Sequence, residues 1–266
     1  MNASKPRAPR TEDNRAGQPR LRVCTYNIHK GFSQFNRRMV IHELRERLRT
    51  LDADIVFLQE VQGLHVRHSA RPADWPQRPQ HEFLAEDFWL QTAYGGNAVY
   101  DHGHHGNAIL SRYPILSAHN QDISDHAFER RGLLHCEIAL PGRADPVHCA
   151  CIHLGLTGGT RRRQMQAIVE RMHTLAGGKA PLIIAGDFND WRNRADDQLC
   201  DSLGVIEAFA GERGRPARSF PATLPVLRLD RIYVRGFQVE SAQSHYGLPW
   251  SKISDHAALT AQLAPL

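Results

Sequence analysis

Short runs of apolar residues, bounded by glycine, proline or polar residues, recur along the chain and predict buried β-strands. In the first run, residues 21–28, strand alternation puts Val23, Thr25 and Asn27 on one face of a sheet. The run 181–185 is continuously apolar and ends in a small-residue turn, which is typical of a strand covered on both faces. Further strands are predicted over residues 54–59, 108–110, 132–140, 146–152 and 227–234, and after His256.

Apolar residues at helical spacing separate several of these strands. Val40, Leu44 and Leu48 form a stripe along a predicted helix over residues 36–50, and Asn36 is placed to cap its start. Other helices are predicted over residues 82–90, 160–176 and 194–203. Alternating strands and helices, together with a hairpin-like pair of strands within 132–152, predict an α/β sandwich rather than a purely parallel sheet.

No linker or internal repeat divides residues 21–266, which are therefore predicted to form one folded domain. Residues 1–20 are rich in proline and arginine, lack the apolar segment of a secretion signal and predict a disordered basic tail. No apolar run approaches the ~20 residues that a membrane helix needs. Residues 65–80 are rich in proline, arginine and histidine and predict a long surface loop.

Composition and charge narrow the function classes only a little. The chain of 266 residues is 41% hydrophobic and 23% charged, which suits a large globular domain. Its formal net charge is +5, but the tail holds five basic and two acidic residues, so +2 remains for the folded part. The pI of about 9.1 is therefore weak support for a nucleic-acid surface.

The cysteines and histidines do not predict a zinc site. Five cysteines without a CxxC pair also argue against a disulfide framework and favour a reducing cytoplasmic location. Cys149 and Cys151 share a strand face with His153, where free cysteines usually act as small apolar groups. The tract of histidine and glycine at 102–107 lacks the spacing of zinc ligands and predicts a polar loop at the rim of the fold.

Polar residues fall repeatedly at strand ends or inside otherwise apolar strands. Each has an ordinary structural explanation on its own: Asp230 beside Arg231 is consistent with an ion pair, and Asp187 with a turn. Eight such coincidences in one fold are better explained by a shared site, because sites form where strand ends converge. The eight residues are Asn27, Glu60, His153, Asp187, Asn189, Asp230, Asp255 and His256.

These residue types suit the attack of water on phosphorus. Glu60 and Asp255 offer the hard oxygen ligands that Mg²⁺ or Mn²⁺ prefers. Asp187 is suited to orient or deprotonate the water, and amides to donate hydrogen bonds to phosphate oxygens. A histidine held protonated by a neighbouring carboxylate stabilises charge on the phosphoryl group, which fits His256 with Asp230. No Walker loop, GxGxxG sequence or serine-nucleophile elbow is present.

A set of motifs resembles the endonuclease/exonuclease/phosphatase superfamily, also called DNase I-like, from about residue 21 to the C-terminus. In chain order these are TYNIHKG, FLQE, HGNAILSRYPI, IHLGL, GDFND, LDRIYV and SDHAAL. GDFND and SDH together with the glutamate of LQE are specific as a set. The segments NIHKGF, RRGLLH, FNDWR and GRPAR, with a later FP, resemble most closely the small bacterial members of YbhP type.

The resemblance implies a four-layer α/β/β/α sandwich of two mixed sheets flanked by helices, and a phosphoesterase that uses Mg²⁺ or Mn²⁺. It implies that Glu60, Asp255 and Asn27 lie at the metal, and that Asn27, Asn107 and Arg131 lie near phosphate. His153 matches the second histidine of nuclease and sphingomyelinase members, whereas abasic-site nucleases carry tyrosine there. The implied catalytic residues are Asp187, Asn189, His256, Asp230 and His153.

The substrate stays open between nucleic acid and a phospholipid or small phosphodiester. Arginines near residues 161–163, 192–194 and 213–218 suit a nucleic acid, and exposed tryptophans suit an apolar ligand, but both also occur on ordinary surfaces and in cores. A catalytically silent relative that only binds a phosphate ligand or nucleic acid is the alternative, and complete motifs argue against it. We expect a monomer.

Overall fold

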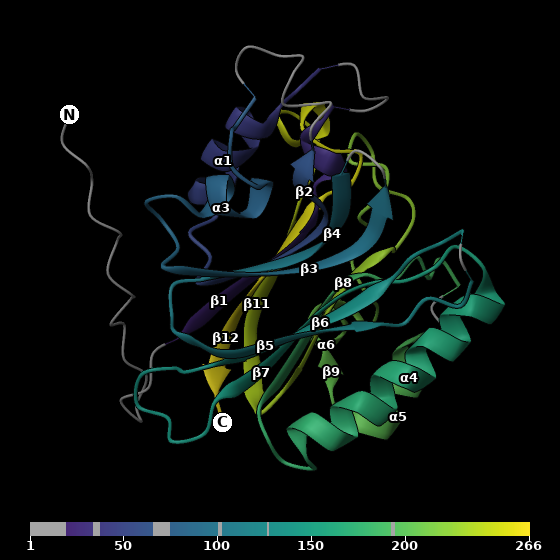
Figure 1. Cartoon of the computed structure of the whole chain (residues 1–266). Coiled ribbons are helices and arrows are strands. Elements are labelled where there is room, and N and C mark those ends of the chain that lie inside the picture. Colours follow the sequence, from purple (N-terminus) through teal and green to yellow (C-terminus); the bar gives the residue numbers. More distant parts are fainter. Residues whose placement is uncertain (1–19, 34–37, 66–74, 101–102, 127, 193–194) are drawn as a thin grey trace.

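The computed structural model describes residues 20–33, 38–65, 75–100, 103–126, 128–192 and 195–266. Within these ranges two mixed six-stranded sheets pack face to face, and helices cover their outer faces (Figure 1). The fold is therefore the predicted four-layer α/β/β/α sandwich. Residues 1–19, most of the predicted tail, lie outside the described residues, as do residues 66–74 of the predicted loop.

The first sheet has the strand order β11-β12-β1-β2-β4-β3. Its bounds are β11 (Phe237–His245), β12 (Ala258–Pro265), β1 (Leu21–Asn27), β2 (Ile55–His65), β4 (Gly103–Ser111) and β3 (Gln91–Tyr100). The second sheet has the order β5-β6-β7-β8-β10-β9. Its bounds are β5 (Ile115–Asp122), β6 (Gly132–Ile138), β7 (Val147–His153), β8 (Leu182–Asp187), β10 (Asp230–Arg235) and β9 (Ile206–Glu207).

Strand alternation distributes the apolar residues between three layers of core. Val23, Phe57 and Cys149 belong to the layer between the sheets. The helices α1 (Ile41–Thr50) and α3 (Gln80–Ala85) lie over the first sheet, and Leu44 of α1 is fully buried there. The helices α4 (Gly158–Ala176) and α5 (Ala195–Leu203) lie over the second sheet, where Ile168 is fully buried. Short segments complete the described part: η1 (His29–Gly31), α6 (Ala210–Arg213) and η3 (Trp250–Lys252).

Several predicted elements have different limits in the structure. The tract 103–107 belongs to β4, not to a loop, because it pairs with β3 in a hairpin. The first helix begins at Ile41, and β10 begins at Asp230 rather than at residue 227. β2 continues beyond Glu60 because its pairing with β4 resumes, after a register shift, at Val61. In the described part of the chain, no helix is both long and apolar enough to cross a lipid bilayer.

Gly186 is required where β7 and β8 approach each other. It has φ +154°, and a Cβ built there would lie 1.9 Å from the carbonyl oxygen of Ile152. We expect Gly186→Ala to lower the free energy of unfolding by at least about 2 kcal/mol, because backbone cannot move aside as a side-chain tip can. Urea unfolding measures this change. Gly178→Ala is the control, since nothing lies within 4 Å of its Cβ position, and an equal loss in both variants would contradict the explanation.

Candidate active site

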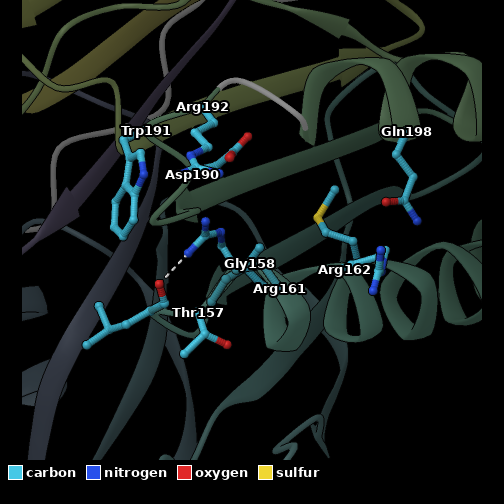
Figure 2. Close-up of a pocket in the computed structure, with 11 residues that line it drawn as sticks. Thr157, Gly158, Arg161, Arg162, Asp190, Trp191, Arg192 and Gln198 are labelled. Atoms are coloured by element: carbon cyan, nitrogen blue, oxygen red, sulfur yellow. Dashed lines mark hydrogen bonds between the residues drawn. The ribbon is translucent and has the colours of Figure 1, made fainter.

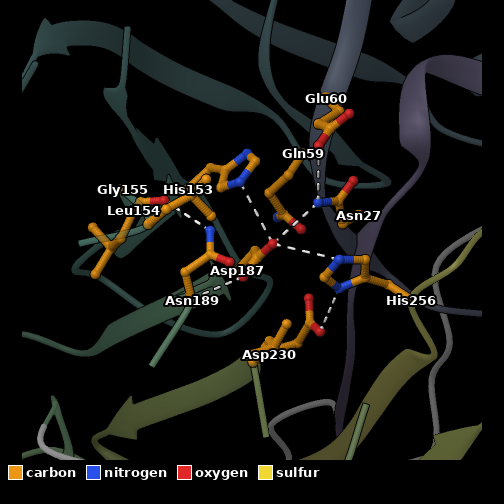
Figure 3. A network of polar contacts seen from close by, with 12 residues as sticks. Asn27, Gln59, Glu60, His153, Leu154, Gly155, Asp187, Asn189, Asp230 and His256 are labelled. Carbon is orange, nitrogen blue, oxygen red and sulfur yellow. Dashed lines mark hydrogen bonds and ion pairs between the residues drawn. The ribbon is translucent and has the colours of Figure 1, made fainter. Parts of the chain in front are cut away.

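Two adjoining features lie at the carboxyl ends of β7 and β8. One is a pocket of about 370 Å³ between the start of α4 and the segment around Trp191 (Figure 2). The other is a network of buried polar side chains centred on Asp187 (Figure 3). They meet at Leu154, which lines the pocket and whose carbonyl accepts a hydrogen bond from Asn189 Nδ2 at 2.9 Å.

Strand register brings three residues of the network into one row. β7 pairs with β8 so that His153 lies opposite Asp187, and β10 pairs with β8 so that Asp230 lies opposite Asp187 from the other side. The first sheet contributes Asn27, the last residue of β1, whose Nδ2 donates to Asp187 Oδ2 at 3.1 Å. The site therefore lies where the ends of inner strands from both sheets meet.

Asp187 is the centre of the network and is 1% exposed. His153 Nε2 lies 3.5 Å and His256 Nε2 lies 3.7 Å from its Oδ2, and the backbone N–H of Asn189 donates to its Oδ1 at 2.9 Å. Burial raises the pKa of Asp187 to about 6, because the hydrogen bonds and the nearby His256 only partly offset the loss of water. A carboxylate with such a pKa is an effective base near neutral pH.

His256 is held by the turn that precedes β12. Its Nδ1 lies 2.8 Å from Asp230 Oδ2, and its backbone N–H donates to Ser254 Oγ at 3.2 Å. The hydroxyl of Ser254 in turn donates to the carbonyl of Asn27, which ties this turn to β1. Burial would lower the pKa of His256, but the carboxylates of Asp230 and Asp187 raise it to about 10. His256 is therefore a protonated imidazolium at neutral pH.

His153 has the opposite character although it contacts the same carboxylate. Burial, followed by the nearby charge of Arg131 and His256, lowers its pKa well below the usual value. A neutral His153 and a charged His256 therefore flank Asp187. Neighbouring titratable groups with pKa values moved apart in this way are typical of catalytic sites.

A group of oxygen donors lies beside Asn27. Asn27 Nδ2 is 3.4 Å from Glu60 Oε1, and both Glu60 and Asp255 have carboxylates about 20% exposed. Each faces one nitrogen-bearing side chain: Lys30 Nζ lies 3.8 Å from Glu60, and His29 Nδ1 lies 3.5 Å from Asp255. The two carboxylates are ligands of the type that a hard divalent cation such as Mg²⁺ prefers, whereas the Asn27 amide turns its nitrogen toward Glu60 and accepts at Oδ1 from the backbone N–H of His29.

A second cluster of possible metal ligands fits less well. This cluster consists of Asp187, Asp230 and His256. Each offers one ligand atom, and the three atoms lie within 4.8 Å of one another. Both ring nitrogens of His256, however, already face carboxylates: Nδ1 lies 2.8 Å from Asp230 Oδ2, and Nε2 lies 3.7 Å from Asp187 Oδ2. The two carboxylates already share one imidazolium, so this cluster fits proton transfer and charge stabilisation better than metal binding.

The remaining predicted residues border the network with their side chains engaged elsewhere. Asn107 Nδ2 donates to the carbonyls of Gly132 and Cys151, which fixes β4 to the second sheet, and its buried Oδ1 has no hydrogen-bond partner among the described residues. Arg131 Nε donates to the carbonyl of Leu154 at 3.0 Å, and its Nη2 pairs with Glu129.

Sequence reasoning assigned no role to three cationic or titratable residues at the site. His29 and Lys30 follow β1 in the tight turn η1, and both have positive φ. Their position directly after Asn27 is a signal that was available in the sequence. His105 lies on β4 within electrostatic range of Lys30 and Glu60, and mainly burial lowers its pKa to about 4. It was missed because the tract around it was interpreted as a loop.

The fold and the site define a class of protein, and sequence comparison agrees with it. The sequence profile of the Endonuclease/Exonuclease/phosphatase family matches residues 24–256, and the chain belongs to this family. The chain is 47% identical over 246 residues to the uncharacterized protein YbhP of Escherichia coli K12. The aligned residues make up 91% of this chain and 96% of that protein.

Solved structures share the fold at low sequence identity. An endonuclease/exonuclease/phosphatase from Beutenbergia cavernae superimposes with a TM-score of 0.72 at 20% identity, covering 92% of this chain and 72% of that one. The mannosyl-6-phosphatase Bt3783 of Bacteroides thetaiotaomicron superimposes with a TM-score of 0.69 at 18% identity, covering 92% and 99%.

Proposed function

We propose that the protein is a divalent-metal-dependent phosphoesterase that hydrolyses phosphodiester bonds by in-line attack of water. The observation that carries the proposal is the position of Asp187, which is buried between a neutral His153 and a charged His256. The amide of Asn27 links Asp187 to the carboxylate of Glu60. A base, a cation and a hard metal-ligand set within one network are the parts that phosphoryl transfer to water requires.

In this proposal Asp187 orients the attacking water and accepts its proton. His256, kept protonated by Asp230, stabilises the negative charge that develops on the phosphoryl oxygens. His153 donates from Nε2 toward Asp187 and so helps to hold its carboxylate in position. In the same proposal Asn189 and Asn27 bind the phosphate, for which the Asn189 amide exchanges its hydrogen bond to the Leu154 carbonyl. Asn107 and Arg131 support the walls of the site.

Glu60, Asp255 and Asn27 would hold the metal ion, Mg²⁺ or Mn²⁺. Bound there, the ion would neutralise phosphate charge and stabilise the leaving oxygen. Lys30 and His29, which face the two carboxylates in this structure, have side chains partly open to solvent and are able to move aside. Lys30 also adds positive charge where the anionic substrate approaches.

The substrate is a phosphate ester of nucleic acid, phospholipid or small-molecule type. The name of the Bacteroides neighbour, a mannosyl-6-phosphatase, supports the ester class but not the choice among these. Purified protein is to be assayed with plasmid DNA, single-stranded DNA, RNA, phospholipids and bis(p-nitrophenyl) phosphate, each with Mg²⁺ or Mn²⁺ and with EDTA. We expect cleavage of at least one substrate that EDTA abolishes and added metal restores.

Glu60→Gln is expected to raise the metal concentration that gives half-maximal activity roughly 10–100-fold, since an amide is a weaker ligand than a carboxylate. A titration of activity against Mg²⁺ measures the change. Glu46→Gln is the control, because Glu46 is an exposed glutamate on the far side of α1. Activity that persists in EDTA, or a Glu60→Gln variant with an unchanged metal titration, would contradict the assignment.

A further inference from the structure

The pocket beside the network is lined by both cationic and apolar side chains. Three arginines and one carboxylate, that of Asp190, contribute its charge, and Trp191 contributes an aromatic wall that is 46% exposed. Figure 2 shows Arg161 directed toward Trp191, with Arg162 and Gln198 on the opposite side. Two further apolar residues of its wall are Leu156 and Met165.

Arg161 places a positive charge at the base of this pocket. Its side chain is 7% exposed, and its Nη1 donates to the carbonyls of Gly155 at 3.2 Å and Leu156 at 2.6 Å. The guanidinium lies over the Trp191 ring, 4.9 Å from its centroid. Among the residues that the structure describes, no carboxylate forms an ion pair with Arg161, and the acidic group that acts on it most strongly is Asp190 of the same pocket.

Arg162 and Arg192 add two exposed guanidinium groups at the mouth of the pocket. Neither forms an ion pair within the described part of the chain, whereas the neighbouring Arg163 points elsewhere and pairs with Asp125. Guanidinium groups recognise phosphate through paired N–H donors. Three of them against one carboxylate favour an anionic ligand, and the apolar wall favours an organic group attached to it.

The pocket is directly connected to the candidate site. Asp190 and Trp191 follow Asn189 in the chain, and Leu154 belongs to both features. Arg161 is also within electrostatic range of Asp187. A ligand group in the pocket therefore lies next to a phosphate held at Asp187.

We propose that this pocket binds a second phosphate group of the substrate, so that the preferred substrates are phosphodiesters with another phosphate beside the scissile one. The inference rests on the proposed function, because it assumes that the scissile phosphate lies at Asp187. Trp191, Leu156 and Met165 then contact the organic group that joins the two phosphates.

Two chromogenic substrates test the proposal. Both are p-nitrophenyl esters of thymidine 5′-phosphate, and only one carries a 3′-phosphate. We expect the 3′-phosphate to lower KM about tenfold, the gain expected from one charge-assisted contact. In Arg162→Ala/Arg192→Ala the ratio of the two KM values should fall toward one, and in the control Arg163→Ala it should stay as in the wild type. An equal KM for both substrates in the wild type, or a ratio unchanged in the double variant, would overturn the proposal.

A binding measurement keeps the two proposals separable. If the wild type cleaves neither ester, the catalytic proposal fails for this substrate class, and the pocket is tested by titrating thymidine 3′,5′-bisphosphate while following tryptophan fluorescence. We expect a saturable change that is absent in Trp191→Phe and weakened about tenfold or more in Arg162→Ala/Arg192→Ala. Thymidine alone should give no such change. No saturable change with the bisphosphate would overturn the pocket proposal independently of catalysis.

Discussion

Asp187→Asn should reduce kcat/KM by roughly 10²–10⁴-fold, the range expected when a general base is lost. The amide retains the shape of the carboxylate and its contact with the backbone N–H of Asn189, but it no longer accepts a proton. Since Asp187 is buried and its pKa is raised by burial, removing the charge relieves a desolvation cost. The variant should therefore fold normally and lose activity without losing stability.

Steady-state kinetics and thermal unfolding separate these two effects. Asp145→Asn provides the control, because Asp145 is an exposed aspartate in a turn of the second sheet and should be neutral in both measurements. If Asp187→Asn kept more than about a tenth of wild-type turnover, Asp187 would not be the base that accepts the proton of water. Lost activity together with a strongly lowered unfolding temperature would point to a structural role instead.

Asp230→Asn should lower kcat by a similar factor and should also change the pH profile. The Asp230 carboxylate lies 2.8 Å from His256 Nδ1 and is the strongest influence that keeps His256 charged against the effect of burial. Without it the imidazolium loses its proton at a lower pH. The alkaline limb of the activity profile should therefore move toward neutral pH, because less of the enzyme carries the proton needed at the phosphoryl group.

The pH profile distinguishes this role from a general loss of fold. A variant that only unfolded in part would lose activity without a shift of the alkaline limb. His256→Gln should abolish that limb altogether, since glutamine does not titrate. If Asp230→Asn and wild type showed the same alkaline limb, His256 would not be acting as a charged group.

The residues of the site were predictable because they stand at ends of apolar runs. Asn27 and Asp187 follow strands whose periodicity is strong, and their contact across the two sheets agrees with the prediction that strand ends converge. The alignment of His153, Asp187 and Asp230 in one row was not predictable, because it depends on the register of three strands. Periodicity within a strand fixes which face of the sheet each side chain occupies, but it does not fix which residue of the neighbouring strand lies opposite.

The strands β3, β5 and β11 were missed for a physical reason, and β9, with two residues, is too short to show a pattern. β5 and β11 lie at sheet edges and expose many of their polar residues, and β3 contains Gly95 and Gly96, which have no side chain to show alternation. Their pairing is determined by neighbouring strands rather than by their own propensity. For the same reason the histidine tract of β4 forms a strand: it pairs with β3, and this pairing places His105 near the site.

The contact between Ser254 and Asn27 joins residues 227 positions apart. The turn that carries it leads into β12, which pairs with β1 on one side and β11 on the other. During synthesis on the ribosome, the first sheet therefore lacks an inner strand, and the site lacks His256, until residues 256–265 have emerged. The proposed active site is therefore completed only by a long-range step of folding, and a nascent chain that already carries Asp187 still lacks the charged group proposed to act with it.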